Sequence, residues 1–295
     1  MGTYSTPSGA HSVQGGPPLA LPLEPLPSWL RRDPSLAVPM LPDVTRRVMA
    51  IAGSPDPSVL RLAELVAKDQ VLTSRVLGLA NSAYSAPALY ISSVRDAIIR
   101  LGTQSVRNLV LAVALASKSQ DRRVYGERGA ALFDHALGTA YLGALVADAA
   151  RADANEAFLC GLLHDIGKLV ILMLAYQHGL RGEGTIPEDQ VDRALAGHHA
   201  AMGARALSRW NLPDSVKEPV ACHHDLASAR LDPRQAAVCA LANRLSHRYG
   251  FGCEADPGDL SDDPAFALLR LDAAWLAATD ERAPRLVEVA RTTLG

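Results

Sequence analysis

The fold is organised around the stretch Gly161-Leu162-Leu163-His164-Asp165-Ile166-Gly167-Lys168. It places an imidazole, a carboxylate and an ammonium group within five residues, inside an otherwise apolar run from Phe158 to Leu174. Because an unpaired charge is costly to bury, His164 and Asp165 need a compensating partner. Three kinds of partner remain open from this stretch alone: a metal ion, other side chains, or a solvent-filled cleft.

The composition predicts an all-α fold. The chain has 295 residues, of which 48% are hydrophobic and only 5% aromatic. Alanine and leucine dominate and β-branched runs are short, which favours helices over strands. Apolar residues at helical spacing predict five short helices between Leu41 and Ala116, joined by mostly short turns into one bundle. No strand pattern of any length is present.

Helices are also predicted in the second half, beyond a polar segment at 117–129 that we interpret as a solvated boundary loop. Asn155 is the expected N-cap of the helix that carries His164 and Asp165. The other predicted helices are Ala130–Ala150, one within Pro187–Trp210, one from Pro213 to the His223-His224 pair, Arg234–Tyr249, and one or two within Asp263–Leu294 on the outside.

The N-terminal residues 1–34 are rich in Gly, Pro and Ser and have no periodicity, which predicts a disordered tail. Within this segment Trp29 and Leu30 are two large apolar side chains in sequence. Two interpretations of this pair remain open, docking on the folded body or membership of the disordered tail.

Charge and cysteine usage limit the class of protein. A net charge of −2 gives no general attraction to nucleic acid or to an acidic membrane. Four cysteines without a CxxC spacing are typical of the reduced thiols of a cytoplasmic protein. No run approaches the ~20 apolar residues of a transmembrane helix, and no signal-peptide pattern is present. We therefore expect a cytoplasmic protein with no membrane or nucleic-acid partner.

Histidine is concentrated beyond residue 130, where imidazoles and one carboxylate fall on four separate predicted helices. Side chains from separate helices can converge on one point in a bundle core. Imidazole and carboxylate together suit Fe, Mn, Zn or Ni better than Ca. The candidate ligands are His135, His164, Asp165, His199, His223 and His224, although these residues could also serve as one another's polar partners.

Taken singly, each of these residues is most simply a hydrogen-bonded core or surface residue, and only the set predicts a site. The remaining histidines, His11, His178, His198 and His247, are assigned to that ordinary class. Adjacent helical residues point about 100° apart. His164 and Asp165 can therefore flank one ion more easily at a helix distortion, which Gly167 would permit.

Several motifs of the chain resemble one known family. In the first half they are Leu41-Pro42-Asp43, Ala67-Lys68-Asp69-Gln70-Val71-Leu72, Leu79-Ala80-Asn81-Ser82-Ala83-Tyr84 and Ala97-Ile98-Ile99-Arg100-Leu101-Gly102. In the second half they are the opening stretch, His199-Ala200-Ala201-Met202-Gly203, Trp210-Asn211-Leu212-Pro213 and His223-His224. Together they resemble an HDOD domain, the regulatory branch of the HD superfamily, over most of the chain.

The resemblance implies an N-terminal helical bundle packed on an HD-like helical half. The implied HDOD domain spans 35–250 and follows the tail at 1–34. Its N-terminal half is 35–117 and its HD-like half is 130–250. A C-terminal helical extension follows at 251–295.

The resemblance also bears on the ligand set. Metal-dependent HD phosphohydrolases use a His, a His-Asp pair and a distant Asp, and related members with more ions add a His and a His-His pair. These positions fall on the six predicted ligands, but the distant Asp falls on Asn243, whose neutral amide is a weaker ligand. The Gly-Tyr-Pro motif of cyclic-di-GMP phosphodiesterase relatives is absent after His224, where the sequence is Asp225-Leu226-Ala227-Ser228-Ala229. That activity is therefore not expected.

The function implied by the resemblance is a non-catalytic signalling or scaffold module of a bacterial-type regulator, which binds a protein partner or a nucleotide signal. The alternative is a metal-dependent phosphohydrolase, a phosphodiesterase acting on a nucleotide, in which Asp165 and Lys168 would be the catalytic residues.

Overall fold

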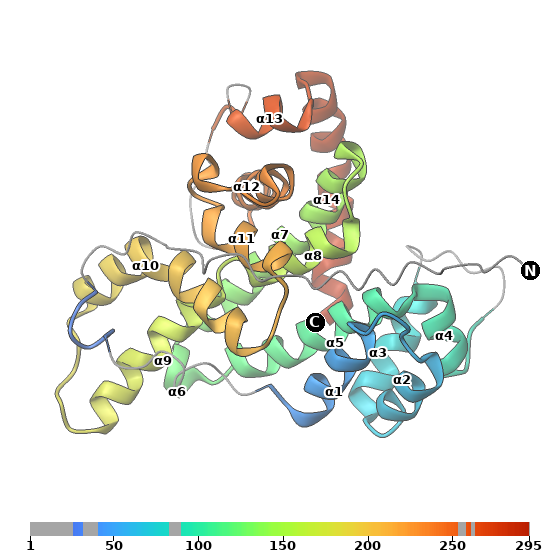
Figure 1. Ribbon diagram of the computed structural model, residues 1–295, viewed down its shortest axis with the longest axis horizontal. Coiled ribbons are helices and arrows are strands. Elements are labelled where there is room, and N and C mark those ends of the chain that lie inside the picture. Colours follow the sequence, from blue (N-terminus) through green and yellow to red (C-terminus); the bar gives the residue numbers. More distant parts are fainter. Residues whose placement is uncertain (1–25, 32–40, 83–89, 253–257, 261–262, 295) are drawn as a thin grey trace, which may run out of the picture.

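The structure is a computed structural model that describes residues 26–31, 41–82, 90–252, 258–260 and 263–294 (Figure 1). Within these ranges every regular element is a helix, which confirms the all-α prediction.

The first half is a bundle of five helices, as predicted. They are α1 (Asp43–Ala52), α2 (Val59–Val66), α3 (Gln70–Ala80), α4 (Val94–Leu101) and α5 (Thr103–Ser119). Their apolar faces enclose one core, in which Val48, Leu62 and Ile98 are fully buried. Ser93 caps α4, because its hydroxyl accepts a hydrogen bond from the backbone N–H of Asp96 at 3.0 Å.

The second half contains the remaining helices. They are α6 (Arg122–Tyr125), α7 (Arg128–Ala150), α8 (Ala154–Leu163), α9 (Ile166–Leu180), α10 (Glu188–Arg209), α11 (Asp214–Cys222), the 3-10 turn η2 (Leu226–Ser228), α12 (Pro233–Arg248), α13 (Pro264–Leu269) and α14 (Ala273–Leu294). The segment 117–129 is thus not one solvated loop, because α5 extends into it and α6 buries Tyr125.

The helix expected to carry His164 and Asp165 is interrupted at these two residues. Leu163 ends α8, Ile166 begins α9, and Asp165 between them has a non-helical φ of −102° and ψ of 10°. The N-cap of α8 is Asp153 rather than Asn155, because the Asp153 carboxylate accepts from the backbone N–H of Asn155 at 2.8 Å. The distortion that a metal site favours is therefore present, and Gly167 lies just after it.

Two glycines bring the helices of the second half into direct backbone contact. A Cβ atom on Gly167 would overlap the carbonyl oxygen of His199 on α10, and one on Gly161 would approach the carbonyl oxygen of Thr139 on α7. Gly167 therefore does not serve as a kink residue but allows α9 to cross α10 closely. Both contacts lie within a turn or two of the central His-Asp pair.

The largest core joins α8, α9, α10 and α11 with a short N-terminal segment. Trp29 is 6% exposed and Leu30 is fully buried in this core. Of the two interpretations of this pair, docking on the folded body is therefore correct. At these two positions the expected disordered tail is part of the core. The rest of the expected tail, 1–25 and 32–34, lies outside the described residues.

The C-terminal extension consists of α13 and α14, within the one or two helices predicted. Helix α14 packs along α7 and reaches α3 and α5 of the first half (Figure 1). Arg291 on α14 donates to the Asp134 carboxylate at 3.3 Å and to the Gly250 carbonyl at 3.1 Å. Its guanidinium carbon also lies 5.2 Å from the centre of the Phe251 ring, so the distal part of α14 is held next to α7.

Two helical segments are long and apolar enough to cross a membrane, Arg128–Ala150 and Ala154–Leu180. Helices α4 and α5, which meet at a sharp bend, are also long and apolar enough when they are counted as one segment. The expectation that nothing approaches this length is therefore wrong. In the fold, 83% of the most apolar window of Ala154–Leu180 is buried, and 50% of that of α7. The absence of a membrane partner stays a prediction.

Candidate metal centre

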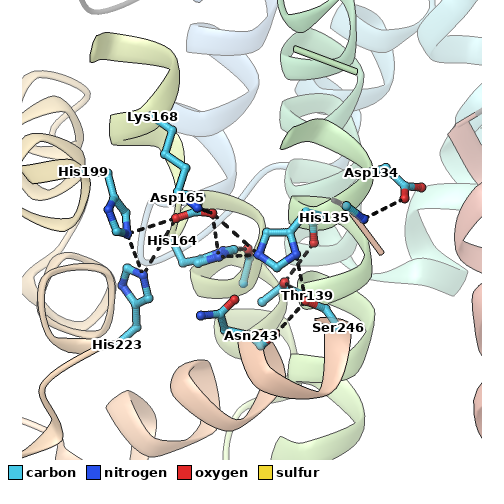
Figure 2. A network of polar contacts seen from close by, with 12 residues as sticks. Asp134, His135, Thr139, His164, Asp165, Lys168, His199, His223, Asn243 and Ser246 are labelled. Carbon is cyan, nitrogen blue, oxygen red and sulfur yellow. Dashed lines mark hydrogen bonds and ion pairs between the residues drawn. The ribbon is translucent and has the colours of Figure 1, made fainter. Parts of the chain in front are cut away.

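The structure brings all six predicted ligands to one place between the helices of the second half. His135 lies on α7, and His164 and Asp165 lie at the break between α8 and α9. His199 lies on α10, and the His223-His224 pair follows α11. Figure 2 shows His135, His164, Asp165, His199 and His223 directed toward one another.

The six residues form two groups of three. The ligand atoms of His199, His223 and His224 all lie within 4.8 Å of one another, and so do those of His135, His164 and Asp165. The first group reaches the surface, because His224 is exposed, whereas the second is buried. Each group has the size and chemistry to hold one ion.

The Asp165 carboxylate lies between the two groups. Its Oδ2 atom is 3.3 Å from Nε2 of His164, and its Oδ1 atom is 3.3 Å from Nε2 of His199 (Figure 2). Lys168 Nζ lies 2.8 Å from Oδ2. The carboxylate thus offers one oxygen to each group, and the Lys168 ammonium compensates part of its charge.

Hydrogen bonds orient three of the imidazoles through the ring nitrogen that lies away from the centre. The Nδ1 atoms of His164, His199 and His223 lie 2.8, 2.6 and 2.7 Å from the carbonyl oxygens of Gly161, Leu195 and Val220. A carbonyl oxygen can only accept, so each Nδ1 carries the proton. Each Nε2 then faces the centre, the arrangement that a second contact sphere imposes on metal-binding histidines.

His135 is oriented in the same way by a hydroxyl group. Its Nδ1 lies 2.9 Å from Oγ of Ser246, and Ser246 in turn donates to the carbonyl oxygen of Asn243 at 2.8 Å. The hydroxyl proton is thus directed at Asn243, so His135 Nδ1 donates to Ser246. Its Nε2 lies 3.1 Å from Nε2 of His164.

Burial keeps these imidazoles neutral. It lowers the pKa of His135 to about 3 and the pKa of His199 to about 4, with Lys168 and neighbouring imidazoles reinforcing the shift and Asp165 opposing it. Burial also lowers the pKa of His223 well below its usual value. At neutral pH the Nε2 atoms of these three residues therefore carry lone pairs and no proton.

The electrostatic consequence is clearest in the open group. Nε2 of His199 lies 3.3 Å from Nε2 of His223 and 3.0 Å from Nε2 of His224. Between His199 and His223 no proton is available to make a hydrogen bond, so two lone pairs face each other. A cation between them converts this repulsion into two ligand bonds. The donor set therefore fits a divalent transition metal.

The buried oxygen atoms of Asp165 and Asn243, like the facing imidazoles, favour a bound cation. Burial would raise the pKa of the Asp165 carboxyl, but His164, Lys168 and His199 outweigh burial and hold this pKa well below its usual value. Asp165 is thus an anion. Oδ1 of Asn243, on α12, is buried without a hydrogen-bond donor among the described residues. Buried oxygens of this kind need a hydrogen-bond donor or a cation.

Sequence reasoning missed three residues that support the centre. Ser246 orients His135, and Thr139 donates to the backbone carbonyl of His135 at 2.8 Å. His247, assigned to the ordinary class, stacks on His135 with ring centres 4.3 Å apart at 17°. Asn243 and His247 are four residues apart on α12, which was the available signal that this helix faces the centre.

The other histidines of the ordinary class are not brought into the two groups. His178 bonds the Gly184 carbonyl at 3.0 Å, and His198 is buried on α10 beside His199. His11 lies outside the described residues.

Comparison with known sequences supports the same family as the motifs. The family profile of the HDOD domain matches residues 38–226. An uncharacterized protein of Treponema pallidum (strain Nichols) is 28% identical over 204 residues, which are 65% of this chain and 38% of that protein. Ribonuclease Y of Opitutus terrae is 28% identical over 151 residues, 51% of this chain and 24% of the enzyme. The chain thus spans well under two thirds of the length of either relative.

Solved structures share the fold. An HDOD domain protein of unknown function from Geobacter sulfurreducens has a TM-score of 0.66 and 25% identity, covering 87% of this chain and 93% of that one. A candidate signal transduction protein from Marinobacter aquaeolei VT8 has a TM-score of 0.66 and 23% identity. The alignment covers 88% of this chain and 60% of that protein. A candidate metal-dependent phosphohydrolase from Shewanella amazonensis SB2B has a TM-score of 0.55 and 19% identity. The alignment covers 79% of this chain and 90% of that protein. The last two likenesses concern the fold alone.

Proposed function

Because this chain belongs to the HDOD domain family, we propose that it is a non-catalytic signalling or scaffold module that retains a divalent transition metal in its histidine-aspartate centre. The observation that carries the retained metal is the contact between Nε2 of His199 and Nε2 of His223, 3.3 Å apart, while the Nδ1 atom of each ring faces a backbone carbonyl oxygen. The ions that suit these ligands are Fe, Mn, Zn and Ni, and the two groups accommodate one or two of them.

Two features support a regulatory rather than a catalytic use of the centre. Asn243 offers a neutral amide where metal-dependent HD enzymes have a carboxylate, which weakens the hold on a catalytic ion. Lys168 Nζ lies 2.8 Å from Asp165 and competes with a metal for the same oxygen. The centre then serves to join helices into the surface that a signalling protein or a nucleotide signal recognises in the cytoplasm.

The alternative is a metal-dependent phosphohydrolase acting on a nucleotide. The observation that favours it is the open side of the centre, because His224 is exposed and the Lys168 side chain is 13% exposed. A bound ion supplies Lewis acidity toward a phosphoryl group. In this reading Lys168 would bind the phosphate, and Asp165 would be among the residues that hold the ion.

The two proposals are separated by metal analysis and by hydrolysis of a phosphoester panel with added Mn or Fe. We expect near-stoichiometric metal in the purified protein and no turnover. Hydrolysis that disappears in Asp165→Ala but persists in the surface variant Asp189→Ala would overturn the non-catalytic proposal. A protein that takes up none of Fe, Mn, Zn and Ni at neutral pH would refute the retained metal.

A further inference from the structure

A cavity of about 860 Å³ lies away from the metal centre, where α14 covers α3, α5, α7 and α8. This volume falls within the ~300–1,000 Å³ of small-molecule sites. Most of its wall is apolar and comes from residues such as Leu109, Leu137 and Leu286. None of the six metal ligands lines it, so the cavity is a separate site in the described part of the chain.

Two aromatic rings stand in the apolar wall. Tyr141 on α7 and Phe158 on α8 both line the cavity, with ring centres 5.3 Å apart at 77°. A T-shaped pair presents a ring face and a ring edge to a neighbouring group. Such a wall is suited to a planar heterocycle, because every base has a π-face that can stack on an aromatic side chain.

A polar corner lies where α5 meets α8. Ser105 donates to Oδ1 of Asn155 at 3.0 Å, and Nδ2 of Asn108 donates to the backbone carbonyl of Asn155 at 2.8 Å. All three residues line the cavity. Amide and hydroxyl groups held in this way can both donate to and accept from the edge of a base.

The mouth of the cavity carries the charges. Arg282 and Arg285 lie one turn apart on α14, both exposed, and neither forms an ion pair with another described residue. Two like charges three residues apart destabilise a helix, and Glu281, four residues before Arg285, offsets only part of this repulsion. A phosphate between them would relieve this repulsion, since guanidinium groups bind phosphate in a two-pronged geometry.

Two carboxylates complete the lining. Asp148 on α7 and Glu281 on α14 also face the cavity. They make the mouth neutral overall, which disfavours a purely anionic ligand. Carboxylates that accept hydrogen bonds from ribose hydroxyls are a recurring feature of nucleotide sites. The lining thus pairs aromatic rings with amides, carboxylates and arginines.

We propose that the cavity between α14 and helices α3, α5, α7 and α8 is a nucleotide-binding site. The heterocycle lies against Tyr141 and Phe158, and the phosphate lies between Arg282 and Arg285. This inference is independent of the metal centre and of whether that centre is catalytic.

The test is calorimetric titration of the metal-stripped full chain with AMP, GMP, CMP, UMP and 3′,5′-cyclic AMP, with inorganic phosphate and decanoate as comparison probes. We expect saturable one-to-one binding of at least one nucleotide. The double variant Arg282→Ala/Arg285→Ala should weaken it by at least about tenfold, because two charge-assisted contacts are lost. Arg61→Ala, on the exposed face of α2, is the matched control and should leave the affinity unchanged.

A second pair of variants tests the location without removing charge. Ala144→Trp fills the cavity from α7 and should abolish nucleotide binding, whereas Ala149→Trp, exposed on the same helix and outside the cavity lining, should not. Binding of decanoate alone, binding of no nucleotide, or nucleotide binding that is lost in His199→Ala but not in the arginine variant would each overturn the proposal.

Discussion

Four histidine rings share one polarity: one ring nitrogen faces a carbonyl or hydroxyl group, and the other faces a common centre. Three backbone carbonyls and one hydroxyl fix this polarity. Because the fixing groups are mostly backbone atoms of the preceding turn, the orientation follows from helix geometry itself. The exception is His135, whose orientation depends on the Ser246 side chain and can therefore be removed by mutation.

Replacement of Ser246 by alanine should weaken metal binding without removing a ligand. His135 would lose the acceptor for its Nδ1 proton, 2.9 Å away, and the loss of such a partner costs about 10- to 100-fold in metal affinity. Competition with a chelator of known affinity measures this change.

The matched control for this prediction is Ser208→Ala. Ser208 also donates to a backbone carbonyl, that of Ala204 on α10, but outside the centre. Equal metal affinities of wild type, Ser246→Ala and Ser208→Ala would show that the hydroxyl does not orient His135.

The metal-stripped protein should lose stability as the pH falls below about 6.5. The unfolded chain protonates its imidazoles below that pH, whereas the folded protein keeps His135 neutral to about pH 3 and His199 neutral to about pH 4. The unfolded state then binds more protons, so each such residue removes up to about 1.4 kcal/mol per pH unit. The free energy of unfolding in urea, measured from pH 7 to pH 4.5, tests this slope.

His199→Gln should flatten the slope, and His178→Gln, which alters a histidine outside the centre, should not. A slope that is the same in all three proteins would contradict the assignment of neutral buried imidazoles.

The identity of the ligand residues could be predicted from sequence, whereas their supporting residues could not. His164-Asp165 and His223-His224 stand out because charged or polar pairs interrupt apolar helices. Ser246 and Thr139 are ordinary helix residues in the sequence. Their role depends on α7 and α12 lying side by side, a contact between residues 107 apart in the chain.

At the scale of elements, the centre depends on how closely α9 and α10 cross. Gly167→Ala should destabilise the protein by about 1–3 kcal/mol, because overpacking forces the backbones apart. A Cβ at this position would overlap the His199 carbonyl, so His199 should also move and metal affinity should fall. Urea unfolding and chelator competition on one preparation measure both effects.

Gly179→Ala on the same helix is the control, because its Cβ would have no atom within 4 Å. This variant should gain about 0.5–1 kcal/mol from the better helix propensity of alanine. Destabilisation of both variants alike would mean that the close crossing at Gly167 is not responsible.

Helix positions were largely predictable, while some of their ends were not. Asp153 and Asn155 are both good N-cap residues two positions apart. The cap is Asp153, whereas Oδ1 of Asn155 accepts a hydrogen bond from Ser105 on α5. No proline or glycine stands at the break between α8 and α9, where the residues are His164 and Asp165, so the sequence contains no helix-breaking residue that would predict it. Periodicity therefore predicted one helix where the structure has two.

At the scale of the whole molecule, a metal at the centre would join α7, α8, α9, α10 and the end of α11. Chelation should therefore lower the melting temperature of the whole protein. Ligand binding to the folded state alone contributes about 2.7 kcal/mol at a hundredfold excess over Kd. Thermal unfolding with and without EDTA, followed by refilling with Mn or Zn, measures the effect.

His199→Ala should show a smaller EDTA-induced shift in melting temperature than the wild type, because one of the two groups loses a ligand, and Asp189→Ala should respond like the wild type. An EDTA shift of equal size in His199→Ala would place the responsible ion elsewhere.

The overall architecture was predictable, but the cavity was not. Five helical segments contribute to its wall, from Leu79 on α3 to Leu286 on α14. Each of these residues resembles an ordinary amphipathic position in the sequence. Only the packing of α14 across both halves brings them around one volume.

Helix α7 is a wall shared by two sites. It presents His135 to the metal centre and Tyr141 and Ala144 to the cavity. Thermodynamic linkage then requires reciprocity: whatever factor a bound metal imposes on nucleotide affinity, a bound nucleotide imposes on metal affinity. A cell that changes the concentration of one ligand would thereby change the occupancy of the other, so the protein could report on two chemical signals through a single helix.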